Sequence, residues 1–192
     1  MENLFIILLT ALFVNNIVLT KFLGICPFIG VSRRTGPALG MSFAVLFVMT
    51  IGSVVSWLMY TFLLEPLGLE YLMILIFIFI IASLVQFTEL FIKAYSDKLY
   101  KSLGIYLPLI TTNCAILGVA FLNIMEEFNF IEALVYSVGS GIGFMLALLL
   151  MSAIRERLEL GNVPEPFKGV PVAFVIAAMM SLVFLGFGAL IR

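Results

Sequence analysis

Six long apolar runs, joined by short polar connections, dominate this sequence. A helix needs roughly 20 apolar residues to cross a hydrocarbon core of about 30 Å, and each run reaches that length. None shows the ten-residue alternation of a membrane β-barrel. We therefore predict an all-α membrane protein with six transmembrane helices, at Leu4–Val31, Leu39–Leu64, Tyr71–Ile92, Leu103–Ile124, Ile131–Ile154 and Val170–Ile191.

Composition agrees with this class, because 64% of the 192 residues are apolar and only 11% are charged. A soluble chain has about a quarter of its residues charged. The connections leave no room for a soluble domain, so we expect one integral membrane domain over 1–192, in contact with membrane lipid. The first run lacks the flanks of a cleavable signal peptide and is expected to be retained. No basic patch with interleaved aromatics is present, which argues against a nucleic-acid partner.

Basic residues fall on alternate connections. They follow the first, third and fifth runs, whereas the second and fourth connections carry only acidic charge. Short cytoplasmic loops are enriched in Lys and Arg, so this bias predicts that both termini lie outside the cytoplasm. The basic residues concerned are Arg33, Arg34, Lys93, Lys98, Lys101, Arg155, Arg157 and Lys168, and the acidic ones are Glu65, Glu70, Glu126 and Glu127.

A short phrase occurs twice, as CPFIGV at Cys26–Val31 and as CAILGV at Cys114–Val119, 88 residues apart. The chain has two cysteines, and each opens one copy of the phrase. We interpret the phrase as the trace of a repeat, with halves of about 1–95 and 96–192. Each half holds three spans, and because three is odd, the second half enters the membrane inverted, as in many transporter folds.

The first and fourth spans are expected to be broken near the membrane midplane. As one helix, Leu4–Val31 would be about 42 Å long, which exceeds the hydrocarbon core, and Asn15, Asn16 and Pro27 interrupt it. In the fourth span, Pro108 and the polar run 111–113 precede the cysteine in a similar way. Unwound backbone inside a membrane is tolerated where protein or a cavity satisfies it, and ions or cofactors often bind there.

Several roles are open to Cys26 and Cys114. Either can be a small buried apolar residue, the two can form a disulfide, or they can bind metal. A thiolate in hydrocarbon needs a counter-charge, so two converging thiolates favour metal. Zinc and iron–sulfur clusters usually take four ligands, and the chain has no histidine. Two cysteines therefore make half a metal site, and the other half would come from a second copy of the chain or from a related partner. A haem-thiolate site is a further alternative, supported only by the dipeptide Cys-Pro.

Other residues of the spans carry weaker signals. Lys21 can offset the charge of a thiolate-bound cluster, line an ion path, or extend to the membrane interface. Backbone N–H groups next to the cysteines, at Gly24, Ile25, Asn113 and Ala115, are candidate donors to sulfur. We also expect close helix packing at two glycine sets, Gly139 with Gly141 and Gly143, and Gly186 with Gly188.

No phosphate loop, HExxH motif, catalytic triad or dinucleotide fingerprint is present, so independent enzymatic activity is not expected. Three functions remain from the residues alone. The chain can be a redox subunit of an ion-pumping complex, a secondary transporter whose cysteines are incidental, or a purely structural subunit.

The runs NNIVLTKFLGICPFIGVS, LPLITTN and TTNCAILGVAFLN, with the six-span layout, give the chain a specific resemblance over its full length. It resembles the A-subunit family of the Rnf electron-transport complex, the ferredoxin:NAD oxidoreductase of bacterial membranes. The D and E subunits of the sodium-translocating NADH:quinone reductase are similar too.

The resemblance implies a membrane subunit of an ion-translocating complex in the bacterial cytoplasmic (inner) membrane. In that family, the A-type protein and the homologous E-type protein have opposite topologies and together hold a membrane-embedded [2Fe–2S] cluster that carries electrons across the bilayer. Carried onto this chain, the cofactor-binding and metal ligands would be Cys26 and Cys114. The other partners implied are the B, C, D and G subunits of the same Rnf complex.

Overall fold

The computed structural model describes residues 2–95, 107–161 and 164–190, and every regular element within these ranges is helical. The first apolar run forms α1 (Glu2–Leu9), the π-helical turn η1 (Thr10–Val14) and the short α2 (Ile25–Gly30). The remaining elements are α3 (Thr35–Met59), η2 (Tyr60–Leu64), α4 (Glu65–Leu67), η3 (Glu70–Leu72), α5 (Met73–Tyr95), α7 (Leu107–Thr111), α8 (Cys114–Met125), α9 (Phe130–Glu159), η4 (Glu165–Phe167) and α10 (Val170–Leu190).

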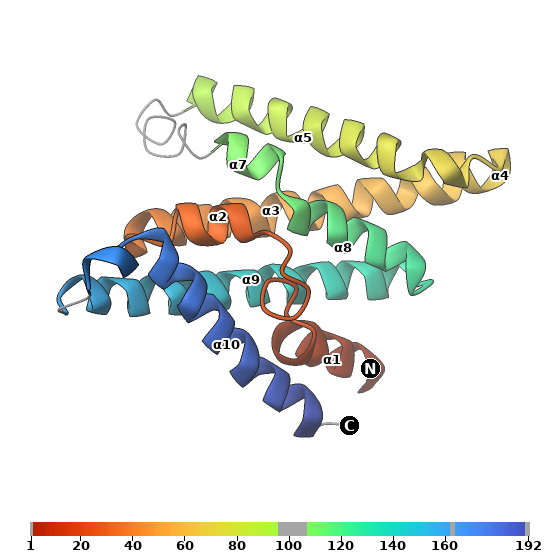
Figure 1. The fold of residues 1–192 in the computed structure, drawn as a ribbon. Coiled ribbons are helices and arrows are strands. Elements are labelled where there is room, and N and C mark those ends of the chain that lie inside the picture. The colour runs from red at the N-terminus through yellow and green to blue at the C-terminus, as the bar shows by residue number, and fades with distance from the viewer. Residues whose placement is uncertain (1, 96–106, 162–163, 191–192) are drawn as a thin grey trace.

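The two longest helices, α3 and α9, lie side by side and run in opposite directions through the middle of the molecule (Figure 1). α8 packs on this pair, α5 and α7 lie on one side of it, and α1 and α10 lie on the other. Every predicted apolar run therefore overlaps one or two helices. The break expected in the first run is found at residues 15–24, and the break expected in the fourth is found at 112–113.

Glycines on α9 allow neighbouring helices to approach closely. A Cβ at Gly141 would lie 3.2 Å from the side chain of Leu46 on α3, and one at Gly139 would lie 3.1 Å from Cβ of Ala11 in η1. A Cβ at Gly143 would lie 3.1 Å from Nδ2 of Asn16, which follows η1 in the chain. The predicted packing of this glycine set is thus confirmed, whereas no atom of this chain lies within 4 Å of a Cβ at Gly186, and position 188 lies outside the described side chains.

Two continuous helical stretches, Thr35–Leu67 and Phe130–Glu159, are long and apolar enough to cross a membrane by themselves. The shorter apolar helices cover Leu4–Val14, Met73–Phe87, Leu109–Met125 and Val170–Gly186. Large apolar side chains stand on the outer faces of α5 and α10: Phe79 is 71% exposed, and Leu182 is 70% exposed. Water would penalise so much exposed apolar surface, whereas lipid would not.

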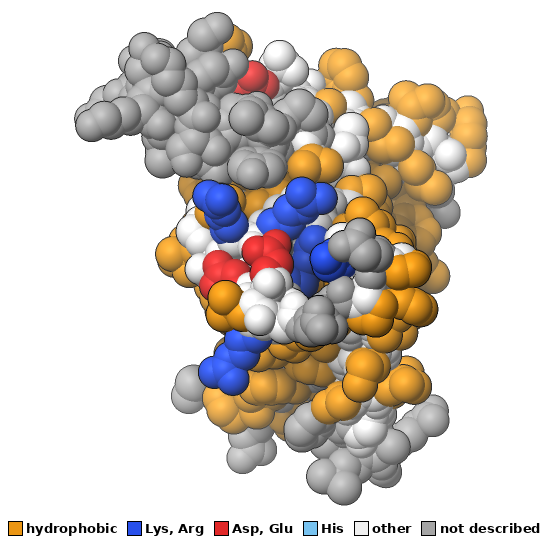
Figure 2. Space-filling view, turned by 60° about the vertical axis from the view of Figure 1, so that its left-hand side comes forward, with side chains coloured by type: hydrophobic (Ala, Val, Ile, Leu, Met, Phe, Trp, Pro, Cys, Tyr) orange, Lys and Arg blue, Asp and Glu red, His pale blue; other side chains and the backbone are white. Residues whose placement is uncertain are grey.

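Charged side chains gather at one end of the molecule, where α3 begins and α9 ends (Figure 2). A carboxylate oxygen of Glu156 on α9 accepts hydrogen bonds from N–H and Oγ1 of Thr35, at 2.8 and 3.0 Å. These contacts bring the connection holding Arg33 and Arg34 to the end that holds Arg157. The lysines expected on the third connection, at positions 93, 98 and 101, lie outside the side chains that the structure describes.

Candidate functional site at the two helix breaks

The side chain of Asn16 holds the first break. It is fully buried, and its Oδ1 accepts hydrogen bonds from the backbone N–H groups of Val18 and Leu19, at 3.2 and 3.4 Å. Its Nδ2 donates to the carbonyl oxygens of Gly143, at 2.8 Å, and Leu12, at 3.3 Å. One amide thus satisfies backbone groups before the break, within it and on α9, where hydrocarbon could not do so.

Two more hydroxyls support the same loop. Ser181 Oγ on α10 donates to the carbonyl of Leu19 at 2.6 Å, and Thr20 Oγ1 donates to the carbonyl of Asn16 at 2.8 Å. The loop then turns through two residues with positive φ, Phe22 at 54° and Gly24 at 79°, before α2 begins at Ile25. The path to α2 is therefore fixed by side chains from within the loop and from α10.

The second break is held by Asn113, which is the N-cap of α8. Its side-chain Oδ1 accepts a hydrogen bond from the N–H of Ala115 at 3.0 Å, and its own N–H donates to the carbonyl of Ile110. An asparagine N-cap of this kind is typical of a helix that starts abruptly. Cys114 is consequently the first residue of α8, at the positive end of the helix dipole.

The two breaks meet in space. The backbone N–H of Gly24 donates a hydrogen bond to Sγ of Cys114, with 3.0 Å between nitrogen and sulfur. Gly24 and Cys26 are two residues apart, a separation that spans at most about 7 Å of chain. The structure therefore brings the two cysteine phrases together, and α2 and α8 leave the meeting point in opposite directions (Figure 1).

Gly24 is required at this contact for two reasons. Its φ of +79° is a conformation that costs a residue with a side chain roughly 1–2 kcal/mol. A Cβ there would also lie 3.0 Å from Cβ of Ala115, 3.0 Å from Cε2 of Phe144 and 3.2 Å from Oδ1 of Asn113. Glycine is thus the residue that lets the first break approach the start of α8.

We expect Gly24→Ala to destabilise the protein by about 2–4 kcal/mol, because backbone strain and overpacking add at this position. The measurement is thermal unfolding of the purified membrane complex in detergent. Gly30→Ala is the matched control, since Gly30 is exposed at the other end of α2 and its Cβ would lie 3.8 Å from the nearest side-chain atom, on Leu109. Equal melting temperatures for the two variants would contradict the packing described for Gly24.

Both cysteines are free and exposed on the chain, so their sulfurs are open to a partner. Among the described residues, no group of three or more His, Cys, Asp or Glu side chains lies close enough together to hold a metal ion. At this place the described part of the chain offers two thiols as possible metal ligands. It also offers one backbone N–H, that of Gly24, which already donates a hydrogen bond to sulfur.

The expected donors to sulfur are confirmed at one position and wrong at two. Gly24 donates to Cys114 Sγ, as predicted. The N–H groups of Asn113 and Ala115 bond instead to the carbonyl of Ile110 and to the Asn113 side chain. Both N–H groups are taken up by hydrogen bonds at the break before α8, so neither donates to sulfur.

Lys21 lies in the first break, exposed, and lines a cavity of about 220 Å³. Oxygen-bearing side chains share this cavity, and they come from η1, the break and the facing ends of α8 and α9. They are Thr10, Asn15, Glu126 and Tyr136. Apolar side chains, those of Ile6, Ile7, Leu122 and Phe128, complete the lining, so this position agrees with an ion path and with the membrane interface alike.

Comparison with known proteins gives the family. The family model described as "Rnf-Nqr subunit, membrane protein" matches residues 4–191. The chain belongs to the Rnf-Nqr family. Full-length relatives in this family include proteins of Aliivibrio salmonicida, at 51% identity, and of Shewanella denitrificans and Proteus mirabilis, each at 52%. Each match covers 100% of both chains, and each relative is named as the A subunit of an ion-translocating oxidoreductase complex.

One buried cation of this Rnf-Nqr chain was missed by the sequence reasoning. Arg155 is 6% exposed, and its Nη1 donates to the carbonyl of Ile29 and to Oγ of Ser32, both at 2.7 Å. It thus joins the end of α9 to the end of α2. In the sequence, Arg155 and Arg157 are two basic residues of one connection, and no pattern distinguishes the buried one.

Proposed function

We propose that this chain is a membrane subunit of an ion-translocating ferredoxin:NAD oxidoreductase complex, in which Cys26 and Cys114 supply two of the four thiolates of a [2Fe–2S] cluster. The observation that carries the proposal is the hydrogen bond from Gly24 N–H to Cys114 Sγ, which puts one cysteine beside the start of the helix that holds the other. Membership of the Rnf-Nqr family and the names of the relatives supply the biological setting.

The donor set fits this cofactor. Four thiolates hold a [2Fe–2S] cluster, and the two exposed cysteines of this chain are half of that number. When bound, such a cluster accepts and releases one electron at a time, which suits a protein without enzymatic motifs of its own. The electron would thereby cross part of the bilayer within this chain.

Groups with partial positive charge face the sulfur of Cys114. Cys114 lies at the positive end of α8, a helix of 12 residues, and Gly24 N–H donates to its sulfur. Hydrogen bonds to sulfur and burial are the two means by which a protein tunes a thiolate-ligated centre. Phe28 and Phe144 are buried, and Phe144 packs next to Gly24, so large apolar side chains form part of the surroundings of the first break.

The missing thiolates are assigned to a homologous membrane protein of opposite topology, the E-type member of the Rnf complex. The B, C, D and G subunits complete the proposed complex. Because both sulfurs are exposed, the partner can reach them without a change in the fold of this chain. The partner's contact surface would then include exposed residues around them, such as Phe22.

The proposal includes the inverted repeat of two three-helix halves, with the breaks near the midplane. Contacts between the two cysteine phrases and the segments that precede them support it. A Cβ at Gly118, in the second phrase, would approach Leu23 before the first cysteine, and one at Gly30, in the first phrase, would approach Leu109 before the second. Each phrase thus packs against the segment before the other cysteine, with Leu23 three residues before Cys26 and Leu109 five residues before Cys114.

We further assign the end that holds Arg33, Arg34 and Arg157 to the cytoplasmic side of the bacterial inner membrane, with both termini on the opposite side. The acidic residues Glu126 and Glu127 follow α8, at the end where the Trp57 Nε1 of α3 donates to the carbonyl of Phe128. The clustering of cations at one end supports this orientation.

The expected result for the purified complex is iron and acid-labile sulfide in a ratio of about one to one, with two irons assigned to the interface between this chain and its partner. Purification of the chain alone is expected to lose that iron, since half of the ligands leave with the partner. The measurement is metal and sulfide analysis of the complex beside the isolated chain. Iron that stays with the isolated chain would contradict a shared site.

A second candidate function is a secondary transporter whose cysteines are incidental. The polar cavity at Lys21, beside a broken helix, is the observation in its favour. A variant with both cysteines changed to serine separates the two functions. A transporter would keep full solute or ion flux in liposomes, whereas the redox subunit would lose electron transfer.

A further inference from the structure

A second cavity lies between the end of α9 and the beginning of α10. Its volume is about 250 Å³, and its lining includes Arg155, Glu159 and Lys168, at the end of the molecule where charged side chains gather (Figure 2). That volume leaves room for a small headgroup rather than for a single water. Its lining residues are Arg155, Leu158, Glu159, Gly161, Lys168, Gly169 and Val172.

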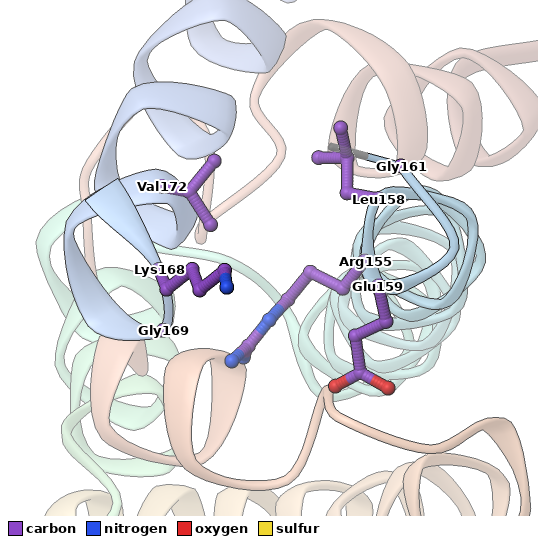
Figure 3. A pocket seen from close by; sticks show the side chains of 7 residues that line it. All are labelled: Arg155, Leu158, Glu159, Gly161, Lys168, Gly169 and Val172. Carbon is purple, nitrogen blue, oxygen red and sulfur yellow. The ribbon is translucent and has the colours of Figure 1, made fainter. Parts of the chain in front are cut away.

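Two cations reach this space from opposite walls. Lys168 extends from the segment before α10, and Arg155 extends from α9, whereas the carboxylate of Glu159 turns away from Lys168 (Figure 3). Arg155 is held in place, because both N–H groups of its Nη1 bond to Ile29 and Ser32. A guanidinium carries five N–H donors, so three more remain on Nε and Nη2 to serve as donors on this wall.

The charge of the lining suits a phosphodiester. The lining brings the cationic groups of Arg155 and Lys168 and the carboxylate of Glu159 to one cavity, and a phosphodiester carries one negative charge. Gly169 and Val172 add the N-terminal turn of α10, a helix of 21 residues, where the first N–H groups, except at Pro171, have no partner within the helix.

Apolar side chains surround this polar cavity. Val170 is 46% exposed and Phe174 is 54% exposed on the first turns of α10, and Leu160, next to Glu159, is 91% exposed. A soluble anion gains nothing from such neighbours, whereas acyl chains can lie against them. Basic pockets between membrane helices on the cytoplasmic side are also where anionic lipid headgroups bind.

We propose that this cavity binds the phosphate group of an anionic phospholipid of the cytoplasmic leaflet, with Arg155 and Lys168 as its cationic ligands. The site has a direct link to the cysteines, because the guanidinium that faces the lipid also holds the carbonyl of Ile29, in the same short helix as Cys26. Bound lipid would therefore stabilise the position of α2.

The experiment is a lipid titration of the purified complex in neutral detergent, with melting temperature as the readout and phosphatidylglycerol as the probe. We expect phosphatidylglycerol to raise the melting temperature and phosphatidylcholine, at the same concentrations, to do so at least fivefold less effectively. In Lys168→Gln, the concentration of phosphatidylglycerol for half of the effect should rise about fivefold, which is the usual contribution of one surface cation.

Arg157→Gln is the matched control, because Arg157 is exposed on the same helix and carries the same charge but does not line the cavity. Its titration should stay within twofold of the unmodified complex. Inorganic phosphate should leave the melting temperature unchanged. A similar weakening in both variants, an equal effect of the two lipids, or a shift produced by phosphate alone would each overturn the proposal.

This readout does not depend on the iron–sulfur cluster. If lipid has no effect on the melting temperature, the conclusion drawn from the iron content still stands. If the complex contains no iron, the conclusion drawn from the lipid titration still stands. The two proposals can therefore fail separately.

Discussion

Cys26→Ser and Cys114→Ser are each expected to remove the EPR signal of the reduced [2Fe–2S] cluster and at least nine-tenths of its iron, in a complex that still assembles. Thiolates are the ligands that such a cluster uses, and a neutral hydroxyl does not replace one. Both cysteines are exposed on this chain, so the exchange of sulfur for oxygen costs little folding free energy, within about 0.5 kcal/mol. The measurements are EPR and iron analysis of complex purified through another of its proteins.

The double serine variant is expected to match the single variants. Ligands of one cluster act as a unit, so the second substitution removes nothing that the first has left. Thr112→Ser is the control, since Thr112 is an exposed residue of the second break two positions before Cys114 and is not a proposed ligand. A full EPR signal in either cysteine variant would show that the sulfur concerned is not a ligand.

The positions of the helices were largely predictable, because long apolar runs in a chain of this composition form helices. The fifth run was predicted at Ile131–Ile154, and the helix found covers Phe130–Glu159. The difference lies at the C-terminal end, where charged residues continue the helix beyond the apolar part. Arg155 and Glu156 there hold the turn between α2 and α3, which is a tertiary reason for the extra turn.

The breaks were predicted in the right runs, but the role given to Pro27 was wrong. Pro27 is the third residue of α2, in the first turn, where the missing N–H of a proline costs nothing. Pro108 is likewise the second residue of α7. Each proline therefore lies in the first turn of a short helix. The interruptions themselves are made by asparagine side chains and, before α2, by a glycine with positive φ.

The contacts that join the two halves could not be predicted from one sequence. Gly24 and Cys114 are 90 residues apart, and Asn16 and Gly143 are 127 apart. Such pairs depend on how whole helices pack, whereas the sequence pattern reports only on each helix separately. The repeated cysteine phrase was the single local signal that indicated a meeting of distant segments.

Asn15 and Asn16 show that the sequence pattern also fails to distinguish two neighbouring residues. The sequence presents them as two equivalent polar residues in an apolar run. In the structure Asn15 is exposed, whereas Asn16 is fully buried and bonds to four backbone groups. Only the packing of α9 against the first break distinguishes them.

Asn16→Leu is therefore expected to destabilise the protein by about 2–6 kcal/mol. The substitution keeps the size of the side chain but leaves the buried N–H groups of Val18 and Leu19 without an acceptor, and each orphaned group costs about 1–3 kcal/mol. In the membrane no water is at hand to replace the lost amide. The measurement is the melting temperature and the yield of folded complex in detergent.

Asn15→Leu is the matched control, because it makes the same chemical change one residue earlier, at an exposed side chain. We expect it to change stability by no more than about 0.5 kcal/mol. Equal losses in the two variants would mean that polarity of the loop matters rather than the bonds of Asn16. If Asn16→Leu alone melts early, the first break is held open by this one amide, and the approach of Gly24 to Cys114 depends on it.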